Sequence, residues 1–79
     1  MIGVDVGTIE DNIILHDICY QVAQEHCNTR VIGADLLYSI VHDIDYDLLN
    51  SITYLFISKR NFDHLKSEVV NRYQRDVKH

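Results

Sequence analysis

The chain has 79 residues, a hydrophobic content of 47% and a formal net charge of −5. This length leaves room for one domain, with a small core, because a domain of this size buries roughly 60–65% of the surface that its unfolded chain exposes. No apolar run approaches the roughly 20 residues that a membrane span needs, and the first residues lack the basic start of a secretory leader.

The two cysteines, Cys19 and Cys27, lie eight positions apart in a segment with helical spacing. A helix would separate them by roughly 12 Å along its axis, whereas a disulfide needs Cα atoms within roughly 7 Å of each other. We therefore expect two free thiols, which are typical of a reducing compartment, and a cytoplasmic location.

The charge of the chain is polarised. Residues 1–47 carry nine acidic residues and one basic residue, Arg30, whereas residues 48–79 carry six basic and three acidic residues. Such a chain can pair head to tail with a second copy, or offer a basic C-terminal face to an acidic partner.

Residues 2–8, with the sequence Ile-Gly-Val-Asp-Val-Gly-Thr, resemble the first phosphate-binding strand and turn of the actin, hexokinase and Hsp70 class of ATPases. Those folds continue into a β-hairpin and are several times longer, whereas the residues that follow here have helical spacing. We therefore interpret residues 1–8 as an N-terminal arm, with Thr8 and Asp11 at the spacing of a capping box. A first helix is predicted over about 9–27, ended by Asn28 and Thr29.

The middle of the chain predicts one long amphipathic helix. Val31 and Ile32 are interpreted as a short extended link, after which apolar residues recur every three or four positions from Leu37 to Leu55. This pattern keeps its phase across the acidic stretch, so a continuous helix over about 34–59 is favoured. The alternative is that Asp45 caps the start of a new helix.

A last helix is predicted over about 62–77, with Asn61 as its N-cap. Its apolar face is predicted to consist of Phe62, Leu65, Val69, Tyr73 and Val77. The sequence thus predicts an all-α, three-helix domain with a long central amphipathic helix, and we expect it to be dimeric.

No residues form a convincing metal, cofactor or catalytic site. His16, Cys19 and His26 lie near one face of the first helix, but about 10.5 Å of helix rise separates Cys19 from His26, too far for one ion. Asp43, Asp45 and Asp47 have the spacing of the first ligands in an EF-hand calcium-binding loop. The residues that follow do not match the later positions of such a loop. No serine or cysteine lies in a glycine-framed nucleophile turn, so we expect neither an enzyme nor a metal-dependent protein.

Basic residues of the C-terminal half could contact nucleic acid. They are Lys59, Arg60, Lys66, Arg72 and Arg75. The strongly acidic remainder of the chain opposes nonspecific attraction to phosphates, so this function is possible but not favoured.

The predicted order of elements is similar to the histone fold: a helix, a link at Arg30-Val31, a long central helix, then Lys59-Arg60 before a closing helix. Glu68-Val69-Val70 occupies the place where that fold often has Asp-Val-Val. The resemblance implies obligate pairing with another such chain. The acidity and the long first helix depart from the core histones, which puts DNA wrapping in doubt.

The high apolar content, the split charge and the absence of a recognisable site favour a small, non-enzymatic regulator, adaptor or inhibitor that binds proteins. We expect a homodimer with no membrane contact. Its interface is predicted to use apolar residues of the central and C-terminal helices: Leu48, Ile52, Leu55, Phe56, Phe62, Leu65, Val69 and Tyr73.

Overall fold

The computed structural model describes residues 9–77, which form four α-helices and no strand. The all-α class is confirmed. The helices are α1 (Ile9–Cys27), α2 (Val31–His42), α3 (Tyr46–Ile52) and α4 (Lys59–Val77). The predicted N-terminal arm over 1–8, with the Thr8 part of its capping box, lies outside the described residues.

Helix α1 has the bounds that the sequence predicts. It ends where Asn28 adopts a left-handed conformation, with φ of 53°, and the Asn28 amide donates to the carbonyl of Gln24 at 3.1 Å. Asparagine is one of the few residues that tolerate this conformation, which closes many helix C-termini.

Helix α2 begins three residues earlier than predicted. The extended link over Val31 and Ile32 is wrong, because the Thr29 hydroxyl accepts a hydrogen bond from the Val31 amide at 3.2 Å and starts the helix there. Gly33 then lies against α1, so that a Cβ atom at this position would be 2.9 Å from the Tyr20 Cα. The short turn and the small residue bring α1 and α2 into close contact.

The continuous helix over 34–59 is wrong, and the alternative start at Asp45 is confirmed. Asp43 adopts a left-handed conformation with φ of 54° and ends α2. The Asp45 carboxylate then accepts from the Leu48 amide at 2.9 Å, which caps α3. Aspartate favours such caps over helix interiors because its side chain competes for backbone amides. Residues 9–77 therefore form four helices rather than the predicted three, and within them the long central helix on which the histone-fold resemblance depends is broken.

The last helix begins at Lys59 rather than at residue 62, so the predicted Asn61 cap is wrong. Ser58 takes that role: its hydroxyl accepts from the Asn61 amide at 3.2 Å, and its carbonyl accepts from the Phe62 amide at 3.0 Å. Serine is among the preferred N-cap residues. The helix continues to Val77, the last of the described residues.

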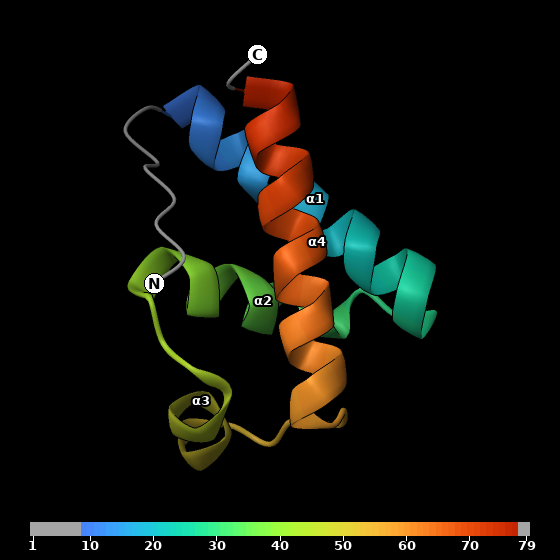
Figure 1. Ribbon diagram of the computed structural model, residues 1–79, viewed down its shortest axis with the longest axis vertical. Helices are drawn as coiled ribbons and strands as arrows, with labels where there is room; N and C mark the ends of the chain where they lie inside the picture. Colours follow the sequence, from blue (N-terminus) through green and yellow to red (C-terminus); the bar gives the residue numbers. More distant parts are fainter. Residues whose placement is uncertain (1–8, 78–79) are drawn as a thin grey trace.

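The core lies where α1, α2 and α4 meet. Helix α4 crosses in front of both α1 and α2, and α2 lies below α1 in this view (Figure 1). The largest fully buried apolar side chains are Leu15, Val22, Leu36, Leu49, Phe62, Val69 and Tyr73. Helix α3 lies at one end of the molecule, apart from α1 (Figure 1), and contributes a single buried residue, Leu49.

Candidate functional site

Four of the eight exposed large apolar side chains of the described residues gather on α3 and on the loop that follows it, and these include the two most exposed, Phe56 and Tyr54. Phe56 is 77% exposed, Tyr54 73%, Ile52 59% and Leu48 53%. Folded proteins leave many single apolar residues in contact with water, but a group of four in nine residues calls for a functional explanation. We call this group the α3 surface.

The four side chains are neighbours in space. Leu48 and Ile52 are four residues apart on one face of α3. Ile52 and Tyr54 line the same open hollow, and the rings of Tyr54 and Phe56 have centroids 4.9 Å apart and are tilted by 32°. The α3 surface is therefore a group of exposed apolar side chains with two adjacent aromatic rings, and polar residues Asn50, Ser51 and Thr53 lie beside them.

The backbone beneath the α3 surface is fixed by one hydrogen bond to a polar side chain and one between backbone groups. The Asn50 side-chain oxygen accepts from the Leu55 amide at 3.2 Å, and the Thr53 amide donates to the Leu49 carbonyl at 2.9 Å. Leu49 and Leu55 point inward and are buried. These contacts fold the loop back onto α3.

A second set of contacts fastens the end of this loop to the core. The Tyr46 hydroxyl donates to the Ile57 carbonyl at 2.7 Å, and the Tyr46 ring lies 5.7 Å from the Phe62 ring, between centroids. The loop is thereby held with Tyr54 and Phe56 facing away from the core.

The structure divides the predicted interface residues into two groups. Five of them are buried within the single chain: Leu55, Phe62, Leu65, Val69 and Tyr73. The other three, Leu48, Ile52 and Phe56, are exposed and belong to the α3 surface. Tyr54 was missed, although the run of β-branched and aromatic residues from Ile52 to Ile57 was a signal that this segment differs from a helix.

Four of the five predicted basic residues contact other groups of the same chain. Lys59 pairs with Asp47 at 3.3 Å, and the hydrogen bond to Asp47 raises the pKa of Lys59. Lys66 donates to the Ile44 carbonyl at 3.3 Å.

The arginines further along α4 are also engaged within the chain. Arg72 pairs with Glu25 and Glu68, and Arg75 pairs with Asp76 at 3.2 Å. Arg60 is exposed at the start of α4.

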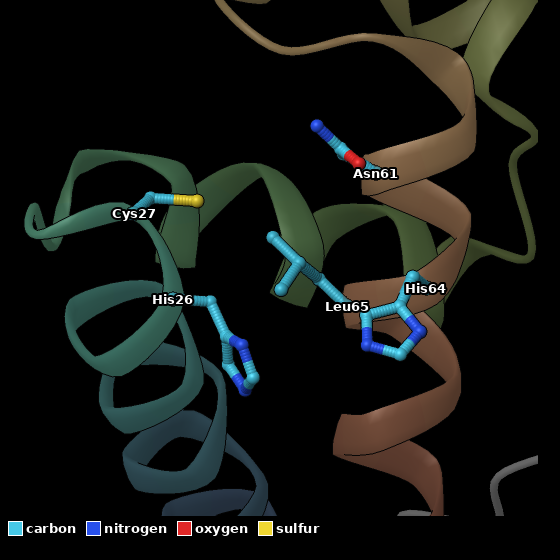
Figure 2. Close-up of a pocket in the computed structure, with 5 residues that line it drawn as sticks. All are labelled: His26, Cys27, Asn61, His64 and Leu65. Atoms are coloured by element: carbon cyan, nitrogen blue, oxygen red, sulfur yellow. The ribbon is translucent and has the colours of Figure 1, made fainter.

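A small hollow of about 170 Å³ lies between the end of α1 and the first half of α4. Figure 2 shows its lining side chains, with His26 and Cys27 on α1 facing Asn61, His64 and Leu65 on α4. The His26 and His64 rings meet edge to face with centroids 6.1 Å apart. Within residues 9–77, however, no three histidine, cysteine, aspartate or glutamate side chains could hold a metal ion together.

The two cysteines are free, as the sequence predicts. Cys19 is buried in the core, and this burial raises the pKa of its thiol to about 12. A thiol with so high a pKa is almost entirely protonated at neutral pH and is a poor nucleophile. Cys27 is half-buried at the hollow.

In the part of the chain that the structure describes, no helix is both long and apolar enough to cross a membrane. No protein-family model, curated protein or solved structure matches this chain.

Proposed function

We propose that this chain is a non-enzymatic protein-binding module that acts as a small regulator, adaptor or inhibitor, and that it forms a homodimer through the α3 surface. The observation that carries the proposal is the exposure of Leu48, Ile52, Tyr54 and Phe56 side by side. Aromatic side chains can each bury about 150–250 Å² and are enriched at protein interfaces.

The charges beside the α3 surface support a second copy as partner. Acidic residues lie at the start of α3 (Asp45, Asp47), and basic residues lie at the start of α4 (Lys59, Arg60). Asp47 already pairs with Lys59 in the same chain, so in a dimer with two-fold symmetry, where the same patch meets itself, we expect the exposed Asp45 of one copy to face the exposed Arg60 of the other. Association of this kind weakens modestly with salt because exposed charges are screened.

The positions of the nucleophilic side chains support a non-enzymatic role. The Ser39 hydroxyl is buried and donates to the Ile44 carbonyl, and the Ser51 hydroxyl donates to the Leu48 carbonyl at 2.6 Å. Ser58 caps α4. All three hydroxyl groups are hydrogen-bonded to backbone atoms. Free thiols at Cys19 and Cys27 support the proposal of a reducing, cytoplasmic location.

Two adjacent leucines provide the test. Leu48 is exposed on the α3 surface, whereas Leu49 is 1% exposed and points into the core. Leu48→Asp should keep the helical circular-dichroism spectrum and a cooperative melt, but sediment as a monomer at concentrations where the unchanged chain is a dimer. Leu49→Asp should unfold the chain, because it buries an unpaired charge.

Sedimentation equilibrium from micromolar to about 100 µM, at low and molar salt, gives the mass of each variant. A monomeric unchanged chain throughout this range would defeat the homodimer. If the unchanged chain and a folded Leu48→Asp variant have equal masses, the α3 surface is not part of the dimer interface.

A further inference from the structure

The hollow between α1 and α4 holds two metal-ligating side chains that the proposed function does not use. His26 lies at the end of α1, and His64 lies in the first half of α4. Figure 2 shows both imidazole rings extending into the space between the two helices. Histidine is the commonest protein ligand of metal ions, so two rings that face each other from different helices form a candidate site.

The distance between the two rings suits one shared ion. Their centroids are 6.1 Å apart, and the ring planes are nearly perpendicular, at 86°. With zinc–nitrogen bonds of about 2.0–2.1 Å and about 1.1 Å from each nitrogen to its ring centroid, two ligating rings have centroids about 5 Å apart at a tetrahedral angle and at most about 6.4 Å apart. Both histidines are exposed, so a small rotation of their side chains closes the difference of about 1 Å.

The hollow has room for the other ligands that such an ion needs. Its volume is about 170 Å³, whereas one water molecule occupies about 30 Å³ in the liquid. Leu65, which is 2% exposed, supplies an apolar wall. Within residues 9–77 no third histidine, cysteine, aspartate or glutamate completes a metal-ligand set, so water takes the remaining positions, as it takes the open position of catalytic zinc sites.

The ion pairs beside the two histidines leave negative charge over. Glu25 directly precedes the histidine of α1, and Glu68 lies one turn after the histidine of α4. Both carboxylates pair with the single guanidinium of Arg72, so the group has one more negative charge than positive charges and attracts a cation. Arg60, one turn before the histidine of α4, is exposed, so solvent screens its charge.

We propose that His26 and His64 together bind one Zn²⁺ ion across the contact between α1 and α4, with water molecules completing its coordination. The two rings face each other only in the folded chain, so the ion stabilises the fold by binding to it selectively. Structural zinc centres have four protein ligands, whereas a site with two is open and exchanges its ion readily. The site uses neither the α3 surface nor the proposed homodimer.

Thermal denaturation of the full chain with Zn²⁺ alone tests the site. The melting temperature should rise by about 4 °C or more at about 0.5 mM Zn²⁺, a shift readily measured for a domain of this size. The same concentration of Mg²⁺ should leave it unchanged, because Mg²⁺ prefers oxygen ligands. No rise with Zn²⁺, or an equal rise with Mg²⁺, would overturn the proposal.

Four single substitutions identify the ligands. His26→Ala and His64→Ala should each abolish the rise, and both should fold because the two side chains are exposed. His16→Ala and His42→Ala are the matched controls and should keep the rise, because the rings of these residues contact tyrosines rather than a second histidine. A rise that survives in His26→Ala or in His64→Ala would overturn the shared site.

Two further measurements separate this site from other ways of binding zinc. Cys27 lines the same hollow, but Cys27→Ser should keep the rise, and its loss would overturn the assignment to two histidines. Sedimentation equilibrium should give the same mass with and without Zn²⁺. A mass that increases with Zn²⁺ would mean that the ion joins two copies, which would overturn a site within one chain but would leave the α3 surface untested by this result.

Discussion

The guanidinium of Arg72 on α4 forms a two-pronged ion pair with the carboxylate of Glu25 on α1, with Nη2–Oε1 and Nη1–Oε2 distances of 2.7 and 3.2 Å. Its Nε atom also donates to Glu68 at 3.0 Å. The pair joins residues 47 positions apart in the sequence, and fork-to-fork geometry makes it more specific than a single contact.

This ion pair predicts a pH dependence of stability. The hydrogen bond from Arg72 is the main reason that the pKa of Glu25 lies below its ordinary value of 4.5. A lowered pKa in the folded state means that the stabilisation is complete above pH 4.5 and is lost as the pH falls through the folded-state pKa. Arg72→Met should therefore melt at a lower temperature than the unchanged chain at pH 7, and this gap should narrow below pH 4.5.

Arg60→Met is the matched control, because Arg60 is exposed at the start of the same helix. It should show little change at any pH. Differential scanning calorimetry between pH 3 and pH 7 measures both variants. A gap for Arg72→Met that stays constant down to pH 3 would contradict the role given to Glu25.

The cap of α3 predicts different results for two substitutions at one position. Asp45→Ala removes the acceptor of the Leu48 amide and should cost about 1 kcal/mol in the free energy of unfolding. Asp45→Asn keeps a good capping side chain and should be nearly silent. Urea denaturation followed by circular dichroism compares them. Equal stability of the two variants would mean that the cap contributes nothing.

The close approach of α1 and α2 predicts that Gly33→Ala destabilises the domain. Alanine favours a helix interior over glycine by about 1 kcal/mol, but its Cβ would be 2.8 Å from the Tyr20 Cδ1 and 2.9 Å from the Tyr20 Cα. The backbone atom cannot rotate away, so the helices must separate, at a cost of about 1–3 kcal/mol. Chemical denaturation should show a net loss of stability, whereas a net gain would mean that α1 and α2 can move apart freely.

The two thiols should differ in reactivity. Cys27 is half-buried, whereas Cys19 is buried and its pKa is raised to about 12. A disulfide reagent at pH 8 should modify one thiol per folded chain quickly and the second only at the rate of unfolding. Cys27→Ser should abolish the fast reaction. A fast reaction that survives in Cys27→Ser would show that the core opens around Cys19.

Sequence periodicity predicted the helical class and the bounds of α1, but it could not locate the break near residue 44. The apolar spacing keeps its phase from α2 into α3, so the pattern looks continuous although the backbone is not. The break depends on Asp43 in a left-handed conformation and on the Asp45 carboxylate at the Leu48 amide. Short polar contacts of this kind cannot be identified unambiguously from the sequence.

Only part of the α3 surface could be predicted, because contacts between segments decide which apolar side chains are exposed. Periodicity identifies apolar side chains but not the neighbour that covers them. Phe56 and Phe62 are six residues apart and chemically identical, yet Phe56 is exposed and Phe62 is buried. The difference arises because Tyr46 and Asn50 fold the intervening loop back, a contact between segments that no local pattern reveals.

The segment from Asp43 to Ser58 is fastened to the other helices at few points. Leu49 is the one residue of α3 that is buried, the Tyr46 ring packs on Phe62, and Lys66 reaches the Ile44 carbonyl. Proteins open in cooperative units, and a unit with few buried contacts opens at a lower free energy than the whole domain. Leu55 adds a second buried side chain and Asp47 pairs with Lys59. We therefore expect the amides of this segment to exchange hydrogen at a lower free energy of opening than those of α1 and α4.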